Sequence, residues 1–324
     1  MKKTVVAFSG ISEYLKHQLN ETFNLLTINP KAGDLTQQFA QLLPQADGMI
    51  GVGRLLNQDI LQHAKRLKVV SSISVGYDNY DLDYLNQRKI ILTNTPDVLT
   101  HSTADLAFAL LMSTARRVVE LDTWTKQGRW HKTVQPAQYG VDVYGKTLGI
   151  IGLGNIGAAV ARRARFGFNM TILHHSRHAK PELEQTLQAK FCSLDDLLAQ
   201  SDFVSIHVAL NEQTHYLIAK AQLERMKKTA ILINVARGSV IDEQALIHAL
   251  THQQILAAGL DVFEQEPLQQ SALFSLPNVI TLPHVGSATL STRQAMDDLA
   301  FDNLSKALSG EQPRYMVNPQ VWSS

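Results

Sequence analysis

Three ionisable side chains in the second half of the chain are of types that together suit one reaction. Arg237, Glu266 and His284 each follow a short apolar run of the kind that forms a buried strand. Reduction of a 2-oxo acid needs a cation to bind the carboxylate and polarise the carbonyl, an acid to protonate the developing alkoxide, and a group that keeps this acid charged near neutral pH. An arginine, a histidine and an acidic partner meet these needs, while a nicotinamide cofactor would supply the hydride. Glu264 competes with Glu266 for the role of acidic partner, and the residues alone leave both open.

A glycine-rich segment offers a place for such a cofactor. It follows the apolar stretch 148–151, opens a helical pattern and has the G-x-G-x-x-G form, with the residues Gly152, Leu153, Gly154, Asn155, Ile156 and Gly157. In this context the first glycine permits a tight turn, the second lets the backbone approach a pyrophosphate, and the third allows close packing of helix on strand. Free N–H groups and the partial positive charge of the helix N-terminus then favour the phosphates. The alternative is that the glycines serve only a strand–helix turn.

The next apolar run indicates which dinucleotide is preferred. An NAD site usually carries an Asp or Glu about 20 residues after the glycine motif, where it holds the ribose 2′-hydroxyl. The sequence has His174, His175, Ser176 and Arg177 there, and no acid. Ser176 and Arg177 could hydrogen-bond and pair with a 2′-phosphate, which a carboxylate would repel. We therefore expect NADPH to be preferred, with NADH possible; the alternative is that Arg177 is a solvated loop charge.

Apolar runs alternate with helical patterns along almost the whole chain, which is typical of βαβ units around parallel sheets. In the first hundred residues an amphipathic stretch at 14–23 accompanies predicted strands at 4–8, 48–52, 69–73 and 90–93. Six further strands, enough for a doubly wound dinucleotide-binding domain, are predicted at 147–151, 170–174, 203–207, 230–234, 257–260 and 279–282. We therefore expect two α/β domains.

Helical patterns connect and close these sets of strands. A long helix is predicted to begin near Ser102, which with Asp105 resembles a capping box, and its apolar face extends to Val119. A loop is expected over 127–144. A final helix is predicted over about 289–308, and the chain end is expected to return to the N-terminal domain.

Length and charge fit small-molecule chemistry. The 324 residues exceed the size at which single hydrophobic cores usually stop growing. With 30 Lys and Arg against 29 Asp and Glu, the net charge of +1 gives no field that would favour nucleic acid or a membrane surface. No stretch approaches the ~18 apolar residues of a membrane span, and the run at 5–8 is too short for a signal peptide, so the expected location is the cytoplasm.

The chain's one cysteine, Cys192, excludes an intramolecular disulfide and a cysteine-based zinc site. It lies at a predicted strand start, where a lone cysteine is more often a small core side chain than a nucleophile. His174, His175 and the scattered acids lack the spacing of metal ligands on one helix face. We expect no metal.

Four segments resemble the D-isomer-specific 2-hydroxyacid dehydrogenases: 152–157, 234–242, 259–267 and 283–287. The resemblance covers nearly the whole chain, includes 74–79, and is strongest to bacterial glyoxylate/hydroxypyruvate reductases of the 2-ketogluconate reductase type. It implies a Rossmann dinucleotide-binding domain, residues 100–287, inserted into a flavodoxin-like substrate domain made of residues 1–99 and 288–324. Both domains would have doubly wound parallel sheets, and the active site would lie between them.

The resemblance also implies roles for individual residues. Arg237 would bind the substrate carboxylate and carbonyl, His284 would be the general acid/base, and Glu266, favoured over Glu264 by spacing, would hydrogen-bond His284 and keep it protonated. Backbone N–H groups of Val75 and Gly76 would hold the substrate carboxylate. The implied cofactor contacts are Thr103, Gly152, Gly154, Asn155, Ile156, Gly157, Ser176, Arg177, Val208, Thr214, Val235, Asp261 and Gly286, with Asp261 near the carboxamide or ring of the nicotinamide.

The implied reaction is the NADPH-dependent reduction of glyoxylate or hydroxypyruvate to a D-2-hydroxy acid, with 2-ketogluconate as a further candidate. Homodimers are usual in the family and form largely through the cofactor domains. Trp130 would either cover the substrate of the neighbouring subunit or lie in the core. One departure is Ala209, where the family commonly has proline, which puts the shape of that adenosine-flanking loop in doubt.

Three other functions share this fold. Formate dehydrogenases replace the acidic partner with glutamine, so Glu266 disfavours them. Phosphite oxidation retains a similar triad and is excluded less firmly. A dinucleotide-sensing corepressor would carry extra partner-binding segments and favour NAD(H), which the compact chain ends and the missing acid disfavour.

Overall fold

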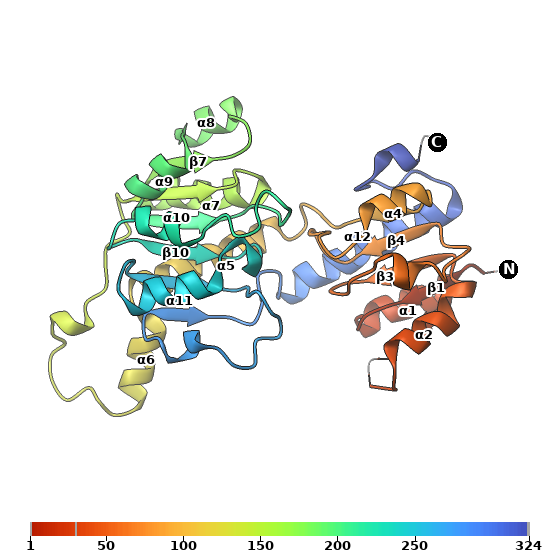
Figure 1. The fold of residues 1–324 in the computed structure, drawn as a ribbon, viewed down its shortest axis with the longest axis horizontal. Coiled ribbons are helices and arrows are strands. Elements are labelled where there is room, and N and C mark those ends of the chain that lie inside the picture. The colour runs from red at the N-terminus through yellow and green to blue at the C-terminus, as the bar shows by residue number, and fades with distance from the viewer. Residues whose placement is uncertain (1, 30, 323–324) are drawn as a thin grey trace. The chain divides into compact units, whose positions relative to one another are not determined.

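Two α/β units make up the chain (Figure 1). The structure is a computed structural model and describes residues 2–29 and 31–322. The first unit combines the residues up to Leu99 with those from Thr289 onward, and the second is the continuous stretch Thr100–Ala288. The second unit is thus inserted into the first in sequence, and it ends one residue later than the expected range.

The first unit contains a five-stranded parallel sheet in the order β2-β1-β3-β4-β5. This 2-1-3-4-5 order is the flavodoxin-like one. Its strands are β1 (Thr4–Ala7), β2 (Asn24–Thr27), β3 (Gly48–Gly51), β4 (Val69–Ser72) and β5 (Ile91–Thr93). The sequence predicts four of them within a residue or two and misses β2, a half-exposed edge strand without a clear apolar run.

Helices cover this sheet, and one of them comes from the end of the chain. They are α1 (Glu13–Thr22), α2 (Leu35–Leu42), α3 (Gln58–Leu61), α4 (Leu82–Gln87) and α12 (Leu290–Ser309). α12 lies on the sheet so closely that a Cβ added to Gly48 would be 2.9 Å from Leu304 Cδ1. The buried Ser71 hydroxyl also donates to the Ala300 carbonyl at 2.8 Å. These contacts make the chain end part of the first unit.

The second unit contains a parallel sheet in the order β12-β11-β10-β9-β6-β7-β8. Its strands are β6 (Thr147–Ile151), β7 (Thr171–His175), β8 (Ala189–Phe191), β9 (Phe203–Ile206), β10 (Ile231–Asn234), β11 (Ala257–Leu260) and β12 (Val279–Thr281). The prediction of two doubly wound parallel-sheet domains is therefore confirmed.

The strand count of six in the second unit is wrong, because the sheet has seven strands. β8 was missed since it has only three residues, none of them buried, and so leaves no apolar run. Cys192 follows the end of β8, whereas the sequence placed it at a strand start. Its side chain is partly buried, and burial raises the pKa of its thiol.

Buried side chains on both faces of the second sheet explain why its strands read as continuous apolar runs. Along β10, Ile231 and Ile233 face one hydrophobic cluster, while Leu232 faces the other. The first cluster includes α5 and α7, and the second includes α9, α10 and α11. The helices of this unit are α5 (Thr100–Ala115), α6 (Val118–Lys126), α7 (Asn155–Phe168), α8 (Pro181–Leu187), α9 (Leu194–Gln200), α10 (Lys220–Arg225) and α11 (Glu243–Thr251).

Two expectations about α5 are wrong. The helix begins at Thr100, so Ser102 is not its cap; the Ser102 hydroxyl donates to the Gly286 carbonyl at 3.0 Å. Asp105 pairs with Arg163 instead of completing a capping box. The apolar face also stops before Val119, because the chain turns at Arg117, whose φ of 54° is in the left-handed region.

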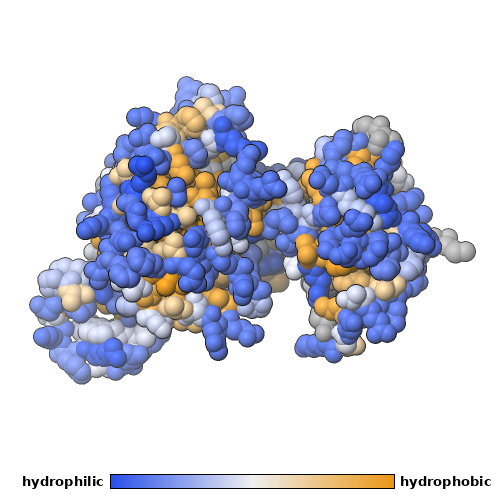
Figure 2. Space-filling view, in the orientation of Figure 1, coloured by the Kyte–Doolittle hydropathy of each residue, from blue (hydrophilic) through white to orange (hydrophobic). Residues whose placement is uncertain are grey.

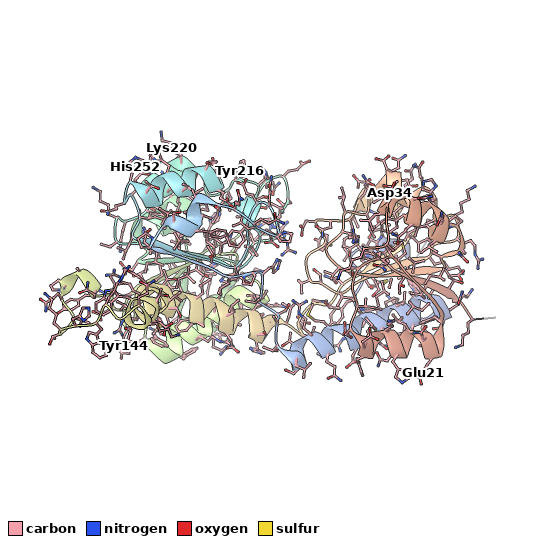
Figure 3. The ribbon with its side chains drawn as sticks, turned by 90° about the horizontal axis from the view of Figure 1, so that it is seen from below. Glu21, Asp34, Tyr144, Tyr216, Lys220 and His252 are labelled. Carbon is pink, nitrogen blue, oxygen red and sulfur yellow. The ribbon has the colours of Figure 1, made fainter. Side chains whose placement is uncertain are left out.

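The turn at Arg117 starts a segment that we call the arm, residues 118–144, consisting of α6 and the loop after it. In Figure 1 the arm extends away from the sheet of the second unit. Several large apolar side chains on it are 40% exposed or more: Val118, Val119, Trp130, Val134, Tyr139 and Tyr144. Figure 2 shows pale residues among the hydrophilic ones on the arm, and in Figure 3 Tyr144 lies on the opposite side of the unit from Tyr216 and Lys220. Trp130, at 63% exposure, is not a core tryptophan.

Candidate active site

The three predicted catalytic side chains follow three neighbouring strands, β10, β11 and β12. Because these strands are parallel, the loops that carry Arg237, Glu266 and His284 all leave the same edge of the sheet. Ligands of open α/β sheets bind outside this carboxyl edge.

His284 and Glu266 are in direct contact. His284 Nδ1 lies 2.6 Å from Glu266 Oε2, so the ring donates through Nδ1 and leaves Nε2 for another partner. The other carboxylate oxygen, Oε1, accepts the N–H of Phe263 at 3.0 Å. His284 has a φ of 54°, a conformation that non-glycine residues rarely adopt and that occurs at functional sites. Both carboxylate oxygens of Glu266 are therefore engaged, and the imidazole is fixed in one tautomer.

The electrostatics of this pair keep the carboxyl ionised. Burial alone would raise the pKa of Glu266, but the hydrogen bond and charge of His284, the Phe263 N–H and the charge of Arg237 together lower it. A carboxylate in this position orients the imidazole and stabilises its protonated form. The arrangement can hold a proton at His284 Nε2 and deliver it to an oxygen.

The loop that carries His284 is held by Asp261, which is buried. Asp261 Oδ1 accepts the Val285 N–H at 2.8 Å, and Oδ2 accepts the Gly286 N–H at 2.9 Å. Burial raises the pKa of Asp261 despite these two bonds and the nearby charge of His284. A Cβ added to Gly286 would lie 3.3 Å from Thr103 Cγ2 and 3.4 Å from Asp261 Oδ2. The structure thus brings Thr103, Asp261 and Gly286 together beside His284.

The loop that carries Arg237 is held by Asn234, a residue that sequence reasoning missed. Asn234 is fully buried at the end of β10; its Oδ1 accepts the Ala236 N–H at 3.0 Å and its Nδ2 donates to the Arg237 carbonyl at 2.9 Å. Gly238 follows, and a Cβ there would lie 1.8 Å from the Phe263 carbonyl carbon. The Arg237 loop therefore packs directly on the backbone of the loop that carries Glu266. The signal available in the sequence was an asparagine at the end of an apolar run, where a polar side chain is unusual.

Glu264 has a different partner from Glu266. Its Oε1 accepts the Glu243 N–H at the start of α11, at 2.9 Å, and Glu243 Oε2 accepts the Glu264 N–H at 3.4 Å. Burial raises the pKa of Glu243. Glu264 thus joins α11 to the loop after β11, and it is Glu266 that contacts His284.

The glycine motif lies between β6 and α7, at the point where the strand order reverses. Gly152 has a φ of 98°, and a Cβ there would lie 2.7 Å from the His207 carbonyl oxygen. Gly154 is the N-cap of α7 and has open space where a Cβ would be. A Cβ on Gly157 would lie 2.2 Å from the Gly152 oxygen. The three positions thus meet the demands for a tight turn, an open approach and close packing, and Asn155 and Ile156 form the first turn of the helix.

The end of β7 lies beside this loop. The hydroxyl of Ser176 accepts the Leu153 N–H at 3.0 Å. Arg177 is exposed, and across residues 2–29 and 31–322 no carboxylate lies within ion-pair distance of it. A guanidinium with this exposure is open to an added anion.

The segment after β9 forms a further wall of the glycine loop. A Cβ on Gly152 would lie 2.9 Å from Val208 Cγ1. The Thr214 hydroxyl donates to the Ala209 carbonyl at 2.7 Å and accepts the Asn211 N–H at 2.8 Å, so it fixes the loop in which alanine replaces the family's usual proline. Val235 is buried in the core cluster that includes α5.

The predicted carboxylate-binding backbone belongs to the first unit. The loop after β4 is held by Ser74, whose hydroxyl donates to the Gly76 carbonyl at 2.9 Å, and by Asn94, which donates to the Val75 carbonyl at 2.9 Å. Within the described part of the chain, the N–H groups of Val75 and Gly76 have no hydrogen-bond partner. Adjacent N–H groups of this kind can donate hydrogen bonds to an anion.

Two kinds of feature are absent from the described residues. No group of three or more His, Cys, Asp and Glu side chains there is arranged to hold a metal ion. No helix in the same part of the chain combines the length and apolar composition that crossing a membrane requires.

Known proteins are similar to this chain in sequence. Residues 108–286 match the model of the D-isomer specific 2-hydroxyacid dehydrogenase NAD-binding domain. The chain is 47% identical over 322 residues to glyoxylate/hydroxypyruvate reductase B of Citrobacter koseri and 48% identical over 322 residues to that of Yersinia pestis, with 99% of each chain covered.

Solved structures share the fold over almost the whole chain. A glyoxylate reductase from Paecilomyes thermophila is similar with a TM-score of 0.87 and 32% identity, covering 99% of this chain and 100% of that one. An NADPH-dependent glyoxylate/hydroxypyruvate reductase from Sinorhizobium meliloti, in complex with NADP and malonate, has a TM-score of 0.87 and 33% identity, covering 98% and 97%.

Proposed function

The chain belongs to the D-isomer specific 2-hydroxyacid dehydrogenase family, and on that premise we propose that it reduces glyoxylate and hydroxypyruvate to D-2-hydroxy acids with NADPH. The observation that carries the proposal is the 2.6 Å contact between His284 and Glu266 on a sheet edge that also carries Arg237. 2-Ketogluconate, which also has a carbonyl beside a carboxylate, is a further substrate of the same chemical class.

His284 is the proton donor in this proposal. Its Nε2 protonates the carbonyl oxygen as negative charge develops there, and Glu266 stabilises the imidazolium and holds the ring in place. Arg237 binds the substrate carboxylate and polarises the carbonyl. When bound, the nicotinamide supplies the hydride to the carbonyl carbon.

The backbone of Val75 and Gly76 is the second carboxylate-binding element in the proposal. Two N–H groups can satisfy a carboxylate without adding a charge that would compete with Arg237. The Ser74 carbonyl accepts the Thr95 N–H at 2.9 Å, and the Val75 carbonyl accepts from Asn94 at 2.9 Å. The peptide planes that carry the N–H groups of Val75 and Gly76 are therefore held before substrate arrives.

The cofactor would bind along the carboxyl edge of the second sheet. The glycine loop and the N-terminus of α7 suit the pyrophosphate, because Gly154 leaves open space there and the helix N-terminus has a partial positive charge. Thr103, Val235, Asp261 and Gly286 mark the nicotinamide end, while Val208 and Thr214 belong to the adenosine side. The exposed Arg177 favours a 2′-phosphate, while its neighbour Ser176 contacts the glycine loop, and the NADP complex of a relative supports the same preference.

The arm supports a homodimer in the proposal. Val118 and Val119 are each about half exposed and Trp130 and Tyr139 are 63% and 60% exposed, which is unusual for apolar side chains on one segment. A second copy of the chain would bury them.

The experiment is to mix the purified protein with NADPH, then NADH, and a panel of 2-oxo acids, and to follow the loss of cofactor absorbance. Rapid oxidation of NADPH with glyoxylate or hydroxypyruvate is the expected result. Arg177→Ala should weaken NADPH by about tenfold while leaving NADH unchanged, since a charge-assisted pair is lost. Activity with NADH alone would refute the cofactor preference, and failure with every 2-oxo acid would move the assignment to phosphite oxidation or to dinucleotide sensing.

A further inference from the structure

A chain of polar contacts runs from α8 to the glycine loop and is not explained by the reaction. His174, fully buried on β7, has its Nε2 3.1 Å from Glu184 Oε1 on α8. Its other nitrogen, Nδ1, lies 3.5 Å from the Ser176 hydroxyl. That hydroxyl accepts the Leu153 N–H, inside the glycine motif, at 3.0 Å. Four groups from three segments are thus connected in series.

The donor and acceptor in each of these contacts can be assigned by starting from Glu184, the group at one end of the series. Glu184 Oε1 also accepts the Lys180 N–H at 2.6 Å, so it is an acceptor and His174 Nε2 must carry the hydrogen. Burial, opposed by Glu184, lowers the pKa of His174, which keeps the ring neutral at neutral pH and leaves Nδ1 as an acceptor. Ser176 therefore donates its hydroxyl hydrogen to Nδ1, and its oxygen faces the Leu153 N–H.

We propose that His174 and Glu184 are positioning residues for the cofactor site, and that they act by holding the Ser176 hydroxyl in the orientation that fixes the glycine loop. In this role Ser176 acts on both dinucleotides through the loop. Discrimination of the 2′-phosphate then falls to Arg177, the exposed cation next to it.

This inference rests on the proposed role of the glycine loop in binding the cofactor. The Leu153 N–H lies between Gly152, with its positive φ, and Gly154, with its open approach, so its partner controls how the turn presents its backbone. Without His174 the partly buried Ser176 hydroxyl could rotate and donate elsewhere, and the Leu153 N–H would lose its fixed acceptor.

The test is a double-mutant cycle on His174→Phe and Ser176→Ala, with dissociation constants for NADPH and NADH measured by titration without substrate. His174→Phe keeps an aromatic ring beside Phe191, whose centroid is 5.3 Å from the His174 ring. We expect each variant to weaken both dinucleotides by a similar factor, about 3- to 10-fold, because one neutral hydrogen bond is lost. The double variant should be no weaker than Ser176→Ala alone, since the two residues act through one contact.

Kinetics separate this role from a structural one. With a 2-oxo acid in excess, KM for the cofactor should rise while kcat changes by less than about twofold, because His284 and Arg237 are untouched. Ser176→Thr, which keeps the hydroxyl, should retain most of the affinity. Glu184→Ala, a milder change in a short surface helix, should show the same pattern and covers the case in which His174→Phe does not fold.

His175→Phe is the matched control. His175 is the next residue on β7, and its Nδ1 contacts the Cys192 carbonyl at 3.2 Å instead of Ser176. The His175→Phe variant should bind NADPH and NADH with the same affinity as the wild type. Additive effects in the cycle, or a loss from Ser176→Ala confined to NADPH, would overturn this inference alone, whereas a wild-type protein that binds neither dinucleotide would overturn the proposed function as well.

Discussion

The proposed catalytic loops, which carry Arg237, Glu266 and His284, and the arm are all surface segments of the second unit, yet they are held in opposite ways. Two of these three loops are each held by a buried side chain that bonds to backbone: Asn234 for the Arg237 loop and Asp261 for the His284 loop. The arm instead carries apolar side chains in solvent, with Trp130 at 63% exposure and no buried residue along α6.

This difference indicates that the two kinds of segment have different functions. A catalytic group must be half exposed and still rigid, which requires a buried scaffold beneath it. His284 fits this pattern, since its side chain is 47% exposed while the N–H groups of the next two residues are bonded to Asp261. Exposed apolar side chains on one segment are stabilised when a partner covers them, which is why we propose that the arm forms a dimer interface.

The largest effect on turnover is expected from substitution of His284. His284→Ala should lower kcat by about 10²- to 10⁴-fold, because the proton donor acts during chemistry. Its dissociation constant for NADPH should change little. Stopped-flow turnover and cofactor titration on the same preparation measure both, and near-normal kcat would refute the role of His284.

The next effect is expected from the scaffold beneath Arg237. Asn234→Ala removes two hydrogen bonds that hold the loop and should lower kcat/KM by about 10- to 100-fold through misplacement of the guanidinium. Asn278→Ala is the control. Asn278 directly precedes β12, at the opposite edge of the sheet, and its side chain donates to the Leu256 carbonyl. If the two variants had equal kcat/KM, the scaffold argument would fail.

A smaller effect concerns pH and the partly buried His207, which follows β9 and has its Nε2 2.8 Å from the Ser205 hydroxyl. Burial lowers the pKa of His207 to about 3, whereas an unfolded histidine has a pKa of about 6.5. Between these values the unfolded state binds a proton that the native state does not, so the free energy of unfolding falls as pH drops, by at most ~1.4 kcal/mol per pH unit. His207→Gln should show a shallower fall between pH 7 and pH 5 in urea unfolding, and equal slopes would contradict the assignment.

The smallest effect on turnover is expected in the arm. Val119→Lys combined with Trp130→Ser should shift the protein from dimer to monomer in light scattering at micromolar concentration, because a charge and a polar group replace apolar contacts. Turnover per chain should change by less than about twofold if the arm only joins subunits. Phe274→Ser, a 52% exposed aromatic elsewhere in the same unit, should leave the dimer intact. A wild-type monomer would remove the basis for the dimer proposal.

The sequence by itself was sufficient for the fold class and for most elements that position the site. Apolar runs such as 147–151 and 257–260 coincide with β6 and β11, because strands of a parallel sheet are buried on both faces and leave an uninterrupted apolar signal. The glycine motif could be interpreted in the same way, since its requirements for positive φ and open space are local properties of the chain. β8 and the start of α5 were not predictable, since their boundaries depend on pairing and packing with distant residues.

Only the tertiary structure decided which side chains work together. Glu264 and Glu266 are two residues apart and of one chemical type, yet one joins α11 and the other contacts His284, eighteen residues further along the chain. Asn234, Asp261 and His174 are single buried polar residues in the sequence, and their roles follow from hydrogen bonds made across neighbouring loops and strands. Such bonds depend on the meeting of strand ends that are adjacent in the sheet and far apart in the chain, which local periodicity does not encode.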